Sequence, residues 1–131
     1  MLVLFLSESG CRKNRNLIPF VPVDVYINLN LPQYSSLNNI GGWMYLDGGS
    51  KGLLVYRRTT EEIIAYDRHC TYNIENPCGA ATVDSNDVTI TCHCDGSQYQ
   101  LYNGTVIKGP ASLALHRYQV NFNGTVVHIY N

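Results

Sequence analysis

This sequence of 131 residues has almost no excess of charge of either sign: 9 Lys and Arg and 10 Asp and Glu give a net charge of −1. Without a positive field to attract a phosphate backbone, we expect no nucleic-acid partner. Long apolar runs are lacking inside the chain, which predicts no internal membrane span. Glycine-rich phosphate loops, the zinc-hydrolase helix motif and nucleophile motifs are also missing. These absences argue against a free-standing enzyme.

Short alternating segments between glycine and asparagine turns make up the chain from Phe20 onward. Tyrosine is abundant, and branched and aromatic side chains pack well on a pleated surface. The period of two, without helix caps, predicts an all-β fold with one loose helical turn near residues 34–38. The expected strands cover residues 22–30, 43–46, 53–56, 62–66, 88–91, 99–102, 105–108, 118–122 and 126–130.

Two Asn-Gly-Thr triplets, Asn103–Thr105 and Asn123–Thr125, stand between apolar segments. They match the glycosylation sequon, but Asn-Gly is also the strongest short-range signal for a hairpin with a type I′ turn. We therefore expect both triplets to close hairpins, because asparagine and glycine tolerate the positive φ that this turn requires.

An apolar run at the start of the chain, Leu2–Leu6, leads through small and polar residues to Cys11. This pattern resembles the end of a bacterial lipoprotein signal, in which a small residue precedes the lipid-modified cysteine. The resemblance implies a lipid on Cys11 and a signal remnant and tether over residues 1–19. It also implies a lipid-anchored protein on the periplasmic or surface side of a bacterial cell envelope. The alternative is a frayed N-terminus with one free cysteine.

Two cysteine-containing stretches, Asp67–Tyr72 and Cys92–Tyr99, resemble the cluster-binding loops of Rieske proteins. In that family the loops read Cys-x-His and Cys-x-x-His-Gly-Ser, and two Cys and two His hold a [2Fe-2S] cluster. Gly109–Ala111 resembles the proline loop of the family. The resemblance covers residues 20–131 and implies antiparallel sheets, with a small cluster-binding subdomain at about 67–111 inserted in a base domain.

Both histidine positions of the family are changed. Cys70 and Cys92 stand at the cysteine positions, whereas Tyr72 and Asp95 replace the histidines. Oxygen ligands add negative charge where neutral imidazoles would raise the potential, so a cluster held this way should be low in potential and labile. We therefore expect no cofactor, with a [2Fe-2S] cluster on these four residues as the alternative.

Other residues near the cysteines bear on the same question. Ser97 and Tyr99 match family residues whose hydroxyls donate to the cluster sulfurs. His69 and His93 each lie beside a ligand-position cysteine and are alternative ligands for iron or zinc. Adjacent residues of an extended segment point to opposite faces, so one loop conformation does not present a histidine and its neighbouring cysteine to the same metal. If they bind no metal, we expect both histidines to be partly exposed loop residues.

The four cysteines other than Cys11 form an even set, as in disulfide-bonded proteins outside the cytoplasm. The resemblance to respiratory-type Rieske proteins implies that Cys78 and Cys94 join the two loops as a disulfide. Without iron, Cys70 and Cys92 would face one another and could form a second bridge. Two bridges would then order the loop tips in place of a cluster.

The favoured interpretation is a Rieske-fold envelope protein without a conventional cluster, serving as a binding or structural module. One alternative is a ferredoxin-like electron carrier with non-standard ligands, and another is a zinc-binding variant. Catalysis is expected at most as an electron-transfer subunit of an oxidoreductase. By analogy with the family, a redox or envelope protein would dock at the loop tips around Tyr72, Asp95 and Pro110.

Overall fold

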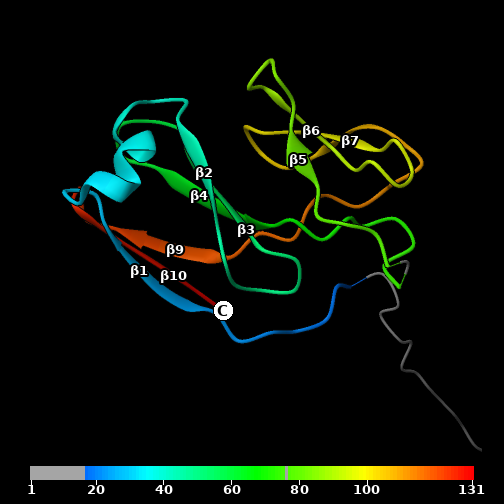
Figure 1. The fold of residues 1–131 in the computed structure, drawn as a ribbon, viewed down its shortest axis with the longest axis horizontal. Coiled ribbons are helices and arrows are strands. Elements are labelled where there is room, and N and C mark those ends of the chain that lie inside the picture. Colours follow the sequence, from blue (N-terminus) through cyan, green and yellow to red (C-terminus); the bar gives the residue numbers. More distant parts are fainter. Residues whose placement is uncertain (1–16, 76) are drawn as a thin grey trace, which may run out of the picture.

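The computed structural model describes residues 17–75 and 77–131. These residues form ten strands and one short 3-10 helix, arranged in three antiparallel sheets (Figure 1). In chain order the elements are β1 (Asp24–Asn28), η1 (Pro32–Asn38), β2 (Trp43–Leu46), β3 (Leu53–Arg57), β4 (Ile63–Asp67), β5 (Thr82–Val83), β6 (Thr89–Thr91), β7 (Gln98–Gln100), β8 (Val106–Lys108), β9 (Gln119–Phe122) and β10 (Val126–Tyr130). The prediction of an all-β fold of antiparallel sheets is confirmed.

Two three-stranded sheets form the base of the molecule, with strand orders β1-β10-β9 and β2-β3-β4. They share one hydrophobic core, to which η1 adds Leu37. Side chains of β3 alternate between two cores: Leu53 and Val55 belong to the base core, whereas Leu54 belongs to a second one. Because β3 and β4 are covered on both faces, their sequences read as continuous apolar runs rather than alternating ones.

The four-stranded sheet β5-β6-β7-β8 is inserted between β4 and β9 and forms a separate lobe (Figure 1). The chain returns to the base where Arg117 bridges Tyr66 and the Tyr118 N–H donates to Ala65 O at 2.9 Å. The second core joins this lobe to β3 and β4 and consists of Leu54, Ile64, Tyr66, Cys70, Ala81, Ile90, Cys92, Tyr99, Leu101, Ala111 and Leu115. Two cysteines therefore lie within the core between base and lobe.

Both predicted hairpins are present, β7–β8 and β9–β10, but their turns are not of the predicted type. The φ angle is positive at the glycine of each triplet, +77° at Gly104 and +98° at Gly124, and is not positive at the asparagines. Instead, each asparagine side chain accepts a hydrogen bond from the backbone N–H of the threonine two residues on, at 3.1 and 2.9 Å. These are Asx turns, in which the side chain replaces a backbone acceptor.

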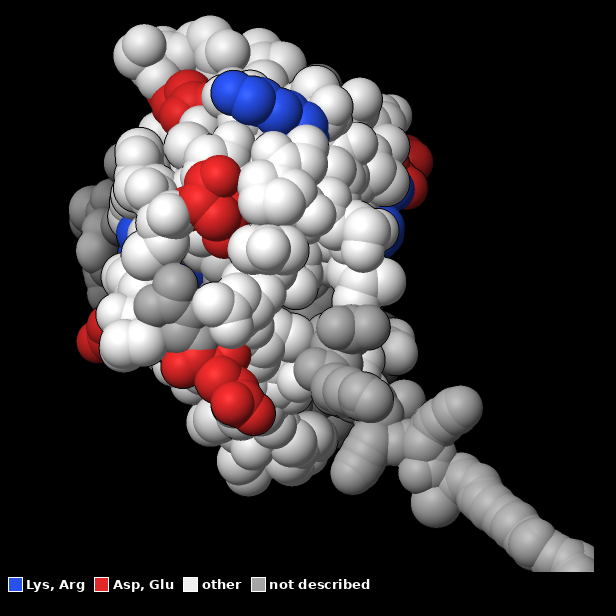
Figure 2. All heavy atoms as spheres, turned by 90° about the vertical axis from the view of Figure 1, so that its right-hand side faces the viewer, with Lys and Arg blue, Asp and Glu red and all other residues white. Residues whose placement is uncertain are grey.

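Among the described residues, no helix is long and apolar enough to cross a membrane. Cys11 lies outside them, and its lipidation stays a prediction. The end of the molecule that carries the inserted lobe faces the viewer in Figure 2, where acidic and basic side chains lie singly or in small groups. Uncharged residues make up most of this face.

Candidate metal centre

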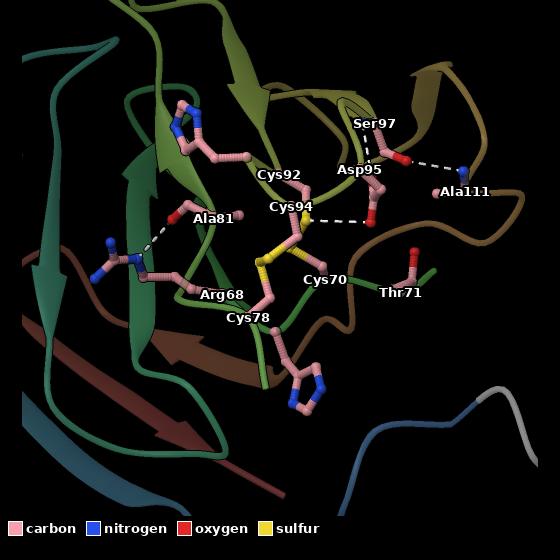
Figure 3. The surroundings of a disulfide bond; sticks show 12 residues. Arg68, Cys70, Thr71, Cys78, Ala81, Cys92, Cys94, Asp95, Ser97 and Ala111 are labelled. Atoms are coloured by element: carbon pink, nitrogen blue, oxygen red, sulfur yellow. Dashed lines mark hydrogen bonds between the residues drawn. A yellow bond between two sulfur atoms is a disulfide. The ribbon is translucent and has the colours of Figure 1, made fainter. Parts of the chain in front are cut away.

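Two disulfides join the β4–β5 loop to the β6–β7 loop (Figure 3). Cys70 is bonded to Cys92 with a Cα–Cα distance of 5.9 Å, and Cys78 to Cys94 with a distance of 5.8 Å. Cys70 and Cys92 are 5% and 0% exposed, Cys78 is half-buried, and Cys94 is exposed. The Sγ atoms of Cys70, Cys78 and Cys92 all lie within 4.8 Å of one another. Together the four residues form a cysteine group that runs from the core to the surface.

Asp95 points its carboxylate into this group. Its Oδ2 lies 3.5 Å from Cys92 Sγ, while its Oδ1 accepts a hydrogen bond from the Ser97 N–H at 2.8 Å. The tight turn that aims it passes through Gly96, whose φ of +81° favours glycine. The sequence-predicted ligand positions Cys70, Cys92 and Asp95 are thus brought together.

Tyr72, the fourth predicted position, lies at the surface with 44% of its area exposed. Within the described part of the chain, no hydrogen bond joins its hydroxyl to Asp95. Its neighbour Thr71 is buried and fixes the backbone of the loop at this point. Tyr72 therefore stands at the edge of the site rather than in contact with its centre.

Hydrogen bonds within the protein engage both ring nitrogens of His69 and one ring nitrogen of His93. His69 is buried rather than partly exposed as expected, and its Nε2 donates to Ile74 O at 2.8 Å while Nδ1 accepts from Ser50 Oγ at 2.8 Å. His93 is exposed, and its Nε2 lies 2.6 Å from Thr82 Oγ1. In this arrangement both rings serve hydrogen bonds within the protein.

Ser97 and Tyr99 hold the neighbouring loops. Ser97 Oγ accepts the Ala111 N–H at 2.8 Å and keeps its own hydroxyl proton for another acceptor. The Thr71 hydroxyl donates to Leu113 O at 2.6 Å, so the Tyr99 hydroxyl donates to Thr71 Oγ1 at 2.9 Å. Of the two hydroxyls expected to face sulfur, that of Ser97 remains free to do so.

Asp67 organises the start of the first cysteine loop, a role that sequence reasoning missed. Its buried carboxylate accepts hydrogen bonds from the N–H groups of Ser50, Lys51 and His69 at 2.6, 3.1 and 2.9 Å, and from the Tyr118 hydroxyl at 2.7 Å. Burial, followed by the hydrogen bond to Asp67, raises the pKa of Tyr118 above its ordinary value. The available signal was a carboxylate at the end of a buried, otherwise apolar strand.

Two basic side chains support the same loop from the base. Arg68 Nε donates to Ala81 O at 2.8 Å, and its guanidinium lies 3.6 Å from the centre of the Tyr45 ring (Figure 3 shows Arg68 and Ala81). Lys51 Nζ donates to Cys78 O at 3.0 Å. The backbone on both sides of the cysteines is thereby fixed to the β2–β3 region.

In this all-β protein, two loops of an inserted antiparallel lobe bring together a pair of buried cysteines and a carboxylate, which makes this place a candidate metal site. The family model described as the Rieske [2Fe-2S] domain matches residues 39–119, more than half of the chain. The chain belongs to this family.

Solved structures with the same fold include the ferredoxin of carbazole 1,9a-dioxygenase from Nocardioides aromaticivorans IC177, at 18% identity and a TM-score of 0.51. That comparison covers 82% of this chain and 95% of the ferredoxin. A complex of reduced oxygenase and oxidized ferredoxin in carbazole 1,9a-dioxygenase also matches, at 21% identity and a TM-score of 0.49, over 70% of this chain and 82% of that one. No curated protein matches the sequence.

These comparisons correct one expectation from the sequence. We expected no cofactor because both histidine ligands are replaced, but the match to the Rieske [2Fe-2S] domain family points to a [2Fe-2S] cluster. The expectation gave too much weight to two substituted positions and too little to the rest of the domain.

The donor set fits such a cluster in one state of the protein. Cys70 and Cys92 offer two sulfurs at adjacent positions, and the Asp95 carboxylate faces them. The disulfide and the cluster would use the same sulfur atoms, so cluster binding requires Cys70 and Cys92 as thiols.

Proposed function

We propose that this chain is an electron-transfer protein of the ferredoxin kind, with a [2Fe-2S] cluster held by Cys70, Cys92 and Asp95. The fourth ligand would be Tyr72, whose exposed side chain would turn toward the centre when the cluster binds. The observation that carries the proposal is the convergence of two cysteine sulfurs and the Asp95 carboxylate in a chain of the Rieske family. The two cysteines would bind one iron as thiolates, and the two oxygen donors would bind the other.

A bound cluster supplies a centre that takes up and gives back a single electron. The chain's own residues set the conditions around that centre. The Ser97 N–H orients Asp95, and the complete burial of Cys92 keeps water from one sulfur. Two anionic oxygens in place of neutral imidazoles favour a low potential, which suits an electron donor.

A redox protein is the partner that this function requires. The exposed side chains of Tyr72 and Leu113 lie near the site, and Pro110 is exposed in the proline loop, Gly109–Ala111. One structural neighbour is the ferredoxin of a dioxygenase, which supports an oxygenase as the class of partner. Contacts there would be largely uncharged, in keeping with the face in Figure 2.

Cluster reconstitution tests the proposal. Protein reduced with a dithiol in the absence of oxygen and supplied with ferrous iron and sulfide should turn brown and hold the iron and sulfide of one cluster per chain. Asp95→Asn and Tyr72→Phe should lower cluster retention. Asp47→Asn and Tyr102→Phe, which alter exposed residues outside the cysteine loops, should not.

A reduced protein that stays colourless and takes up no iron would overturn this function. Uptake of zinc instead of iron would favour the zinc-binding alternative, for which Cys70, Cys78 and Cys92 form the closest sulfur group.

A further inference from the structure

The two disulfides differ in their access to solvent. Reduction of a disulfide requires a thiolate to reach one of its sulfurs. Cys94 is exposed, whereas Cys70 and Cys92 are 5% and 0% exposed. A reductant in solution therefore reaches the Cys78–Cys94 bond directly, while the Cys70–Cys92 bond is shielded.

Cys78 connects the exposed bond with the shielded one. Its Sγ is bonded to Cys94 and lies within 4.8 Å of the sulfurs of Cys70 and Cys92. The hydrogen bond from Lys51 Nζ to Cys78 O holds the Cys78 backbone independently of its disulfide. A thiol released at Cys78 would thus already lie beside the buried bond.

We propose that Cys78 and Cys94 form a thiol–disulfide relay that passes reducing equivalents from a dithiol reductant to the buried Cys70–Cys92 bond. The relay rests on the proposed function in one respect, because the two thiols that it frees are the cysteines assigned to iron. Its chemistry requires no iron, so the two proposals fail separately.

The exchange balances in four steps. A thiolate of the reductant attacks Cys94 Sγ, the bond to Cys78 breaks, and Cys78 leaves as a thiolate. The second thiol of the reductant attacks the mixed disulfide, and the oxidised reductant departs while Cys94 becomes a thiol. Cys78 then attacks one sulfur of the Cys70–Cys92 bond and releases the other, and Cys94 finally attacks Cys78 to restore their bond. The net transfer is two electrons and two protons to Cys70 and Cys92.

Two single substitutions test the relay and control for each other. Cys94→Ser and Cys78→Ser remove the same disulfide, so both lose the same covalent constraint, but only Cys94→Ser keeps a thiol beside the buried bond. Both are made in a Cys11→Ser background, and their folding is compared by near-ultraviolet circular dichroism. The readout is alkylation of free thiols during reduction with dithiothreitol, followed by mass spectrometry of each cysteine.

In Cys94→Ser, the relay predicts disulfides between Cys78 and Cys70 or Cys92, and rapid reduction of the buried pair. In Cys78→Ser, the Cys70–Cys92 bond should not exchange with residue 78, and its reduction should be slower by on the order of tenfold or more, since access to the attacked sulfur sets the rate. Equal reduction rates in the two variants would overturn the relay.

The protein with its four loop cysteines provides a measurement that does not depend on the folding of either variant. Alkylation at short times should trap chains in which Cys94 is modified and Cys78 is bonded to Cys70 or Cys92. Release of the buried thiols with no such species at any time would overturn the relay. Cluster uptake is measured separately on fully reduced protein, so a failure to bind iron leaves the exchange result unaffected.

Discussion

The Tyr118 hydroxyl donates a hydrogen bond of 2.7 Å to Asp67 Oδ2, and this contact fastens the segment that leads into β9 to the last residue of β4. Asp67 is also the residue from which the chain departs into the first cysteine loop. The same carboxylate accepts the His69 N–H at 2.9 Å. The position of Cys70 therefore depends on a buried carboxylate in the base of the molecule.

Asp67→Asn should lower the free energy of unfolding by about 2–4 kcal/mol, because an amide turns a donor toward groups that are themselves donors. Tyr118→Phe removes a single hydrogen bond to Asp67 and should cost less, about 1–2 kcal/mol. Urea denaturation of both variants checks the order. An equal loss of unfolding free energy in Asp67→Asn and Tyr118→Phe would show that the Asp67 carboxylate does not act as an acceptor shared by several donors.

Gly49→Ala should destabilise the protein more than Gly124→Ala, although both glycines have positive φ, +64° and +98°. A Cβ at Gly49 would collide with Asp67 Oδ2 and the Tyr118 hydroxyl, whereas one at Gly124 meets nothing within 4 Å. We expect about 1 kcal/mol at Gly124 from backbone strain alone and about 3 kcal/mol or more at Gly49. Thermal or urea unfolding measures the destabilisation of the two variants. A destabilisation by Gly124→Ala equal to or larger than that by Gly49→Ala would contradict the predicted collision at Gly49.

Alkaline pH should weaken the fold through two tyrosines. Burial raises the pKa of Tyr66 and Tyr118 above the ordinary value, and for Tyr118 the hydrogen bond to Asp67 adds to the effect. The folded-state pKa of both tyrosines lies above the unfolded value of about 10. Their contribution to the free energy of unfolding is therefore complete below about pH 10 and is lost as pH rises from there through the folded-state pKa. The free energy of unfolding should therefore fall above pH 10, and less steeply in Tyr66→Phe or Tyr118→Phe. The exposed Tyr102→Phe serves as control, and an unchanged slope in all three variants would refute the assignment.

Both hairpins and every described strand except the two-residue β5 (Thr82–Val83) could be predicted, because the signals act between residues close in sequence. The glycine-bounded segments Trp43–Leu46 and Leu53–Tyr56 fall on β2 and β3. The turn type at Asn103–Thr105 could not be read in the same way, because the asparagine side chain competes with the backbone as acceptor. The preference of Asn-Gly for type I′ turns does not tell which of the two acceptors is used.

The surroundings of the cysteines were harder to predict, since they depend on residues far apart in the chain. His69 is buried because Ser50, from the β2–β3 loop, and Ile74, from its own loop, satisfy both ring nitrogens. Nothing in the sequence next to His69 indicates Ser50 as a partner. The cysteine and Asp95 positions were visible in a short motif, whereas the supporting contacts arise only from packing of the lobe on the base.

Ser97→Ala should separate structural support from tuning of the cluster. Loss of Ser97 Oγ leaves the N–H of the buried residue Ala111 without its acceptor, which should lower the free energy of unfolding by about 1–2 kcal/mol. The free hydroxyl proton of Ser97 is also available to a cluster sulfur, and its removal should lower the reduction potential of reconstituted protein. Ser112→Ala, at an exposed residue next to Ala111, should change neither quantity. Urea denaturation measures the stability and a redox titration measures the potential. A loss of stability with an unchanged potential would restrict Ser97 to holding the proline loop, Gly109–Ala111.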